Sequence, residues 1–339
     1  MWQVIGQNRA VSLLQGGLER NSLAHAYLFV GPAHVGKMAL ALNLAQALNC
    51  ENTPPPCGEC ASCQKIAAAK HADVQVIRPN GESSEASENK AMIGVSQIEE
   101  LQHAASLPPF EGRCKIFVID GAELLSNGAS NRLLKTLEEP VARVVFILLT
   151  TNEHLMPATV ISRCQRVELS PLGVSQIEAA LHTRWGVELP RAKLLARLAH
   201  GCLGWAVSAA LDSNLSQQRS EQMDELLAVT IGSGEARFTF ADQLAAQFSR
   251  DRASVQEKLN LWLDWWRDLL LVKTGLNDAV TNIDRSAKLG EIAKGYSLAQ
   301  IRTFIKCLQA AGVQLKLNAN PRLVLEALML DMPEASKIA

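Results

Sequence analysis

The stretch Ala26–Met38, AYLFVGPAHVGKM, constrains the fold of this chain more than any other. Its first five residues are apolar and predict a buried parallel strand, and the residues that follow Lys37 have the pattern of a helix. Between them lies a loop bounded by Gly31 and Gly36. A strand, a glycine-bounded loop, a lysine and a helix form the layout of a phosphate-binding loop, in which backbone N–H groups and the lysine hold an anion.

The residue after the lysine departs from this layout. A phosphate-binding loop continues with Ser or Thr, whose hydroxyl holds Mg²⁺, but this position is occupied by Met38. A thioether is a soft ligand and Mg²⁺ prefers hard oxygen ligands, so Met38 cannot replace the hydroxyl. The sequence therefore predicts a loop that has the shape of a nucleotide site but is a poor candidate for binding ATP with Mg²⁺.

Length and composition exclude several classes of protein. A chain of 339 residues is expected to form two or three domains, and 48% hydrophobic with 20% charged residues is typical of a soluble globular protein. The formal net charge of −1 argues against a chain that binds nucleic acid on its own through a broad basic face. Because we find neither a long apolar run nor an export signal, we expect no membrane span and a cytoplasmic location.

Half of the eight cysteines fall within fourteen positions, at Cys50, Cys57, Cys60 and Cys63. Two overlapping C-x-x-C steps and one cysteine upstream can surround a tetrahedral ion, and zinc is the natural occupant. Four thiolates leave no open coordination position, so such a site would be structural rather than catalytic. The alternatives are four unrelated cysteines, a redox pair or an iron–sulfur cluster.

Apolar segments separated by helical patterns predict a doubly wound parallel sheet of five strands in residues 1–169, an α/β fold. The expected strands are Ala26–Val30, Val74–Ile77, Lys115–Asp120, Val144–Thr150 and Arg166–Leu169. Helical patterns cover Asn8–Leu18, Met38–Leu48, Val95–Ala105 and Asn131–Glu139. The small polar residues of Asn80–Lys90 predict a mobile loop.

The remainder of the chain has only helical patterns. Residues 170–212 are expected to form a small module of three helices, Val174–Trp185, Arg191–His200 and Leu203–Leu211. A polar linker at Asp212–Gln217 would lead into a second helical domain in residues 213–339, which ends in a helix at Asn318–Met332. Trp262, Trp265 and Trp266 form an apolar stripe on one helix, which is more typical of a core or a subunit interface than of a ligand site.

Polar residues follow two of the expected strands. Asp120 ends one of them and is a candidate second ligand for Mg²⁺, although a helix cap is an equally good interpretation. ATPases that hydrolyse usually carry an acid next, but here Gly121 follows, and Glu123 comes two positions late. Thr150-Thr151-Asn152 end another strand, where binding sites lie in open α/β sheets, and ordinary capping is the alternative.

Several of these pieces together resemble the AAA+ clamp-loader family. They are HAYLFVGP-x-x-x-GK, the four-cysteine insertion at residues 50–63, KIFVIDGAELL, NRLLKTLEEP, the strand ending in TTN, and SRC at Ser162–Cys164. The resemblance covers nearly all of the chain. It implies an AAA+ sheet domain, a three-helix lid and an all-α collar that joins other clamp-loader subunits in a hetero-pentameric ring. Such rings use ATP to open a sliding clamp and place it on primer–template DNA.

The resemblance also assigns roles to individual residues. Arg163, the arginine of SRC, would act in trans on the γ-phosphate held by a neighbouring subunit, because a guanidinium is always charged and its fork fits phosphate oxygens. Without the resemblance, an ordinary surface or ion-paired arginine is the better interpretation. Gly31, Gly36, Lys37 and Asp120 would form a degenerate nucleotide site.

The chain departs from the family pattern at Met38 and Gly121, and in the lid Trp205 stands where ATP-sensing relatives carry an arginine. We therefore expect a ring member that lacks an ATPase site of its own and lends Arg163 to its neighbour. The alternatives are a ring subunit with its own ATPase activity and a zinc-dependent DNA-binding module.

Overall fold

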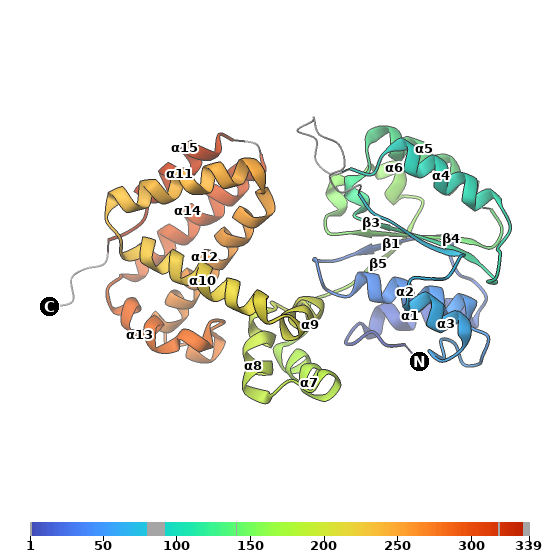
Figure 1. Ribbon diagram of the computed structural model, residues 1–339, viewed down its shortest axis with the longest axis horizontal. Coiled ribbons are helices and arrows are strands. Elements are labelled where there is room, and N and C mark those ends of the chain that lie inside the picture. Colours follow the sequence, from blue (N-terminus) through green and yellow to red (C-terminus); the bar gives the residue numbers. More distant parts are fainter. Residues whose placement is uncertain (1, 80–91, 140, 318, 335–339) are drawn as a thin grey trace. The chain divides into compact units, whose positions relative to one another are not determined.

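The computed structural model describes residues 2–79, 92–139, 141–317 and 319–334. The chain divides into two compact units (Figure 1). The first contains Met1–Ala180 and His200–Trp205, and the second contains Leu181–Ala199 and Ala206–Ala339. The domain bounds expected from the sequence differ from this division and stay a prediction. Among the described residues, no helix combines the length and the apolar character that crossing a membrane requires.

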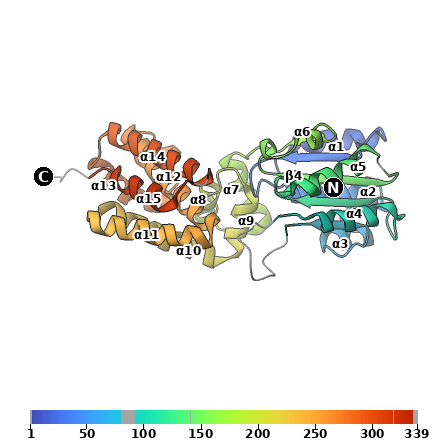
Figure 2. The same cartoon turned by 90° about the horizontal axis from the view of Figure 1, so that it is seen from above.

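The first unit is built on a five-stranded sheet with the order β2-β3-β4-β1-β5, in which all neighbouring strands are parallel. Helices cover both faces of the sheet (Figures 1 and 2). One face packs against α4, α5 and α6, and the other against α1, α2 and α3. Alternate residues of a strand enter opposite cores, as Leu28 and Phe29 do. Burial on both faces explains why the three central strands are nearly continuous apolar runs.

The expected fold class is confirmed, and four strands begin and end where the sequence predicts. They are β1 (Ala26–Val30), β2 (Val74–Ile77), β3 (Lys115–Asp120) and β4 (Val144–Thr150). The fifth, β5 (Gln165–Glu168), begins and ends one residue earlier than expected. The helices of this unit are α1 (Asn8–Glu19), α2 (Lys37–Asn49), α3 (Ala61–Ala67), α4 (Val95–Ser106), α5 (Asn127–Glu138), α6 (Ala158–Ile161) and the part of α7 (Val174–Trp185) up to Ala180, with short 3-10 turns η1 (Ala122–Leu124) and η2 (Glu153–Leu155). The rest of α7, from Leu181 on, belongs to the second unit. The expected mobile loop at Asn80–Lys90 lies outside the described residues.

The predicted linker at Asp212–Gln217 is wrong. Asp212 is the N-cap of a long helix, α10 (Ser213–Ile231), and its side chain accepts a hydrogen bond of 2.9 Å from the backbone N–H of Asn214. The first turns of this helix are polar because residues 214–217 are exposed to solvent. Polar composition therefore marked an exposed helix rather than a break in the structure.

Helices alone form the second unit. They are α8 (Leu189–Leu198), α9 (Leu203–Leu211), α10, α11 (Gly234–Arg250), α12 (Arg252–Lys273), α13 (Ser286–Lys294), α14 (Leu298–Lys316) and α15 (Pro321–Leu330), with short turns η3 (Asn277–Ala279) and η4 (Ile283–Arg285); the first residues of α9 belong to the first unit. The side chain of Asn320 caps α15, and Asn318 lies outside the described residues.

The three tryptophans of α12 lie in the core of the second unit. Trp262, Trp265 and Trp266 are each at most 1% exposed. The ring centroid of Trp266 lies 4.6 Å from that of Phe304 and 5.1 Å from that of Tyr296. Of the two roles that the sequence allowed for this stripe, the structure therefore shows core packing.

Candidate functional site

The predicted strand, loop and helix are present at the candidate nucleotide site. β1 ends at Val30, the loop follows, and α2 begins at Lys37. Gly36 is the N-cap of α2 and has a φ of 109°, a backbone conformation that residues with a side chain rarely adopt. A glycine suits this position, because the chain must turn sharply here to pass from the strand into the helix.

The amine of Lys37 is bound by the loop itself. Lys37 is 9% exposed, and its Nζ donates hydrogen bonds to the carbonyl oxygens of Gly31, at 2.6 Å, and Pro32, at 2.7 Å. Burial lowers the pKa of Lys37, and the carboxylates of Glu123 and Asp120 oppose this lowering. The group that would reach a phosphate is therefore already paired with two neutral acceptors of its own loop.

Gly204, near the start of α9, packs directly on the loop. The backbone N–H of Gly204 donates a hydrogen bond of 2.8 Å to the carbonyl oxygen of His34. A Cβ atom on Gly204 would lie 2.8 Å from that same oxygen, closer than such atoms approach in proteins. The sequence interpretation singled out the adjacent Trp205, and the structure adds a contact of Gly204 with the loop.

We expect Gly204→Ala to destabilise the chain by about 1–3 kcal/mol, because overpacking a tight contact costs this much. Gly290→Ala is the matched control, since Gly290 also lies in a helix but a Cβ there meets no atom within 4 Å. The control should be neutral or stabilising by up to about 1 kcal/mol. Urea unfolding of both variants measures the difference, and equal stabilities would show that the loop and the lid yield freely.

The two acidic residues after β3 take different positions. The side chain of Asp120 pairs with Arg78, with Nε and Oδ2 3.3 Å apart, and does not cap the turn that follows. Glu123 accepts hydrogen bonds from the backbone N–H of Thr151, at 3.0 Å, and from its hydroxyl, at 2.5 Å. Burial would raise the pKa of Glu123, but the bonds from Thr151 keep the net pKa below its ordinary value. Glu123 therefore joins the carboxyl ends of β3 and β4 as an anion.

Thr150 and Asn152 have local structural roles at the end of β4. Thr150 is 1% exposed, and its hydroxyl accepts a hydrogen bond of 3.1 Å from the backbone N–H of Asn152. The side chain of Asn152 in turn accepts from the N–H of His154. These contacts are those of the capping interpretation that the sequence left open.

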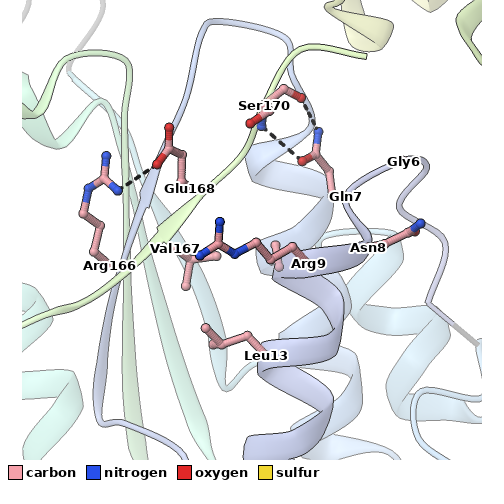
Figure 3. A pocket seen from close by; sticks show the side chains of 10 residues that line it. Gly6, Gln7, Asn8, Arg9, Leu13, Arg166, Val167, Glu168 and Ser170 are labelled. Carbon is pink, nitrogen blue, oxygen red and sulfur yellow. Dashed lines mark hydrogen bonds and ion pairs between the residues drawn. The ribbon is translucent and has the colours of Figure 1, made fainter. Parts of the chain in front are cut away.

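A pocket of about 330 Å³ lies between the start of α1 and β5, and residues of the phosphate-binding-type loop do not line it (Figure 3). Gln7 occupies the N-cap position of α1, but its side chain makes no capping hydrogen bond to that helix. Its amide instead donates to the carbonyl oxygen of Ser170, at 2.8 Å, and accepts from the Ser170 N–H, at 3.2 Å. The guanidinium of Arg9 extends across the pocket toward Val167 (Figure 3). Gln7 thus fastens α1 to the segment after β5.

Arg163 lies just after α6 and is held by acceptors of its own chain. One terminal nitrogen, Nη1, donates to the carbonyl oxygen of Thr159, at 2.9 Å, and to the hydroxyl of Ser162, at 3.4 Å. The other, Nη2, pairs with the carboxylate of Glu138 at the end of α5. The side chain is 34% exposed. Within the described residues, none of its partners belongs to the loop at Gly31–Lys37.

The four predicted cysteines come together. The sulfur atoms of Cys50, Cys57, Cys60 and Cys63 all lie within 4.8 Å of one another. Zinc–sulfur bonds of about 2.3 Å in a tetrahedron place the sulfurs about 3.8 Å apart. The sulfurs of Cys57 and Cys63 are 3.9 Å apart, which matches this spacing.

Backbone N–H groups surround the cysteine cluster. The N–H groups of Glu59 and Cys60 both point at the sulfur of Cys57, and they lower its pKa to about 6. Burial raises the pKa of Cys63 to about 12. The sulfur of Cys60 accepts from the N–H of Cys63 and thereby caps α3, a helix that the sequence patterns did not reveal. The N–H groups favour the thiolate of Cys57, and a cation bound by all four sulfurs would offset the burial that opposes the thiolate of Cys63.

Comparisons with known proteins cover most of both units. A family described as DNA polymerase III, delta subunit, matches residues 6–173, and a family described as DNA polymerase III, delta subunit, C terminal, matches residues 213–334. The chain belongs to the clamp-loader subunits of DNA polymerase III. The family resemblance inferred from the sequence motifs is thereby confirmed.

Individual relatives of this clamp-loader subunit differ in type. It is 29% identical to the delta-prime subunit of Bacillus subtilis DNA polymerase III, over 97% of this chain and 96% of that protein. It is also 29% identical to the tau subunit of the same organism, over 98% of this chain, but it spans only 61% of the tau subunit's length. A structure of a gamma-subunit-related protein from Thermotoga maritima is 19% identical, covers 95% of this chain and 97% of its own, and has a TM-score of 0.49.

Proposed function

We propose that the chain is a delta-prime-type subunit of a DNA polymerase III clamp loader that does not hydrolyse ATP itself. In this proposal it joins gamma or tau and delta subunits in a hetero-pentameric ring, which loads a sliding clamp on primed DNA during replication. Its Arg163 contacts nucleotide bound by a neighbouring subunit. One contrast carries the proposal: the amine of Lys37 is bound inside its own loop, whereas the guanidinium of Arg163 is partly exposed at the surface.

The chemistry of the loop supports the first half of the proposal. Met38 offers no hard oxygen to Mg²⁺, and Gly121 offers no carboxylate to orient water. Trp205 stands where ATP-sensing relatives carry an arginine, so this position offers no cation to a phosphate. Loss of one group that stabilises a transition state commonly costs about 10²–10³-fold in rate, so the combined loss leaves no useful hydrolysis.

We expect the isolated chain to show no ATP turnover above background, and Met38→Thr to leave this unchanged. The new hydroxyl would supply one ligand, but Lys37 would stay bound to the loop carbonyls and Gly121 would still lack a carboxylate. Phosphate release and ATP titration with Mg²⁺ measure the result. Steady turnover by the unmodified chain would refute the proposal.

The alternative function is an active gamma- or tau-like ATPase subunit. The similarity to a tau subunit over 98% of this chain favours it, because that similarity includes the loop and both units. The titration of the isolated chain with ATP and Mg²⁺ separates the two functions, since an active subunit would bind ATP with Mg²⁺ there and the proposed subunit would not.

We also propose that Cys50, Cys57, Cys60 and Cys63 hold a structural zinc ion. The mutual distances of the sulfurs and the surrounding N–H groups support this assignment. The ion would fix the segment that precedes α3 and would take no part in hydrolysis, since four protein ligands fill a tetrahedral site. An iron–sulfur cluster would instead give colour and iron on elemental analysis.

A further inference from the structure

The guanidinium of Arg163 has an anionic partner within its own chain. We propose that Glu138 is a positioning residue for Arg163: its carboxylate holds the guanidinium in the free subunit and competes for it with the phosphate groups of a nucleotide on the neighbouring subunit. This inference rests on the role proposed above for Arg163. It adds a residue that sets how readily the arginine is released.

The partners of Arg163 differ in whether they can be exchanged. Nη1 is bound by Thr159 and Ser162, which belong to α6 and its end, so these contacts fix the side chain relative to its own segment. Nη2 is bound by Glu138, which comes from another helix, α5. Among these partners, Glu138 alone comes from another helix and alone is an anion, so it is the partner that a phosphate can replace.

A carboxylate is a chemical substitute for phosphate at this position. Both groups present anionic oxygens that accept hydrogen bonds from the planar fork of a guanidinium. While Glu138 is bound, it also neutralises the charge that would attract phosphate. The carboxylate and an incoming phosphate should therefore exclude each other at Nη2.

The position of Glu138 on α5 is not explained by the stability of that helix. Glu138 is the last residue of α5, where the helix dipole is negative and a carboxylate is unfavourable. Its pairing with Arg163 compensates for this placement. The side chains of Glu138 and Arg163 are 49% and 34% exposed, so the pair is weak enough for phosphate to displace it.

Chemical labelling of the isolated chain tests the pair directly. Phenylglyoxal modifies accessible arginines, and peptide mass mapping gives the rate at each one. We expect Glu138→Gln to speed the labelling of Arg163 by about two- to fivefold, which is the range that a surface ion pair can supply. Glu139→Gln is the matched control, since Glu139 is an adjacent exposed carboxylate. Arg132, which pairs with Glu99, is an internal reference whose rate should not change.

The assembled clamp loader tests the competition. We expect Glu138→Gln to raise kcat/KM for ATP by up to about fivefold. The control Glu139→Gln should leave kcat/KM unchanged. In the double variant, Arg163→Ala should remove the gain that Glu138→Gln gives. A merely structural role for Glu138 would lower the thermal midpoint of unfolding without raising kcat/KM.

The outcomes separate the inference from the proposed function. If Arg163→Ala lowers hydrolysis but Glu138→Gln alters neither the labelling nor kcat/KM, the inference is wrong and the function stands. If Arg163→Ala has no effect on hydrolysis, the proposed function is wrong, and the competition inferred for Glu138 is rejected with it even where labelling confirms the ion pair.

Discussion

Replacing Arg163 by alanine is expected to lower hydrolysis at the ATP site of the neighbouring subunit by a factor on the order of 10³ or more, which is what an arginine supplied in trans contributes. A permanent positive charge offsets the charge on the phosphoryl oxygens in the transition state, and alanine offers nothing in its place. The measurement is ATP turnover by the assembled complex, which should fall to the rate that the remaining sites supply.

Two controls accompany the Arg163 variant. Arg132→Ala removes another exposed arginine that has an ion pair with Glu99, and it should leave turnover unchanged. Arg163→Lys keeps the charge but loses the planar fork, so it should restore only part of the rate. Undiminished turnover by the complex with Arg163→Ala would exclude the proposed role in trans.

Removal of the proposed zinc ion should have the largest effect on stability. In small zinc modules the ion contributes on the order of 10 kcal/mol to folding. For a domain of this size 1 kcal/mol shifts the thermal midpoint by about 2–4 °C, so we expect Cys60→Ser, or exhaustive chelation, to lower the midpoint of the first unit by roughly 10 °C or more. Calorimetry gives the midpoint, and elemental analysis of the unmodified chain should find one equivalent of zinc.

Cys307→Ser is the matched control for the zinc experiment. Cys307 lies on α14 in the second unit, outside the cluster of four cysteines. Its replacement should change neither the zinc content nor the midpoint of the first unit. A chain that lacks zinc as purified, and whose midpoint chelators do not alter, would contradict the assignment of a structural ion.

The accuracy of the strand predictions has a physical origin. A central strand such as β4, covered on both faces, is a continuous apolar run whose ends are visible as changes in polarity. The predicted bounds of β5 were one residue too late because β5 is an edge strand in which Val167 alone is buried. Helix α3 was missed because its N-cap is Cys60, a residue that carries no capping signal in sequence patterns.

The candidate site was predictable to the extent that its residues are close together in the sequence. The four cysteines and the loop that ends at Lys37 fall into this class. By contrast, the pairing of Arg163 with Glu138 and the contact of Gly204 with His34 join segments that are far apart in the chain. Such contacts depend on the packing of helices, for which spacing along the sequence gives no signal.

The placement of the tryptophans makes the two units distinguishable by fluorescence. Trp262, Trp265 and Trp266 are half of the six tryptophans in the chain and lie together in the second unit. Their buried indole rings should emit at short wavelength, and a shift to the red would mark the exposure of that unit to water. Trp2 and Trp205 belong to the first unit, so in a chain in which both are replaced by phenylalanine the emission follows the helical unit alone while the cysteine-bearing unit is perturbed separately.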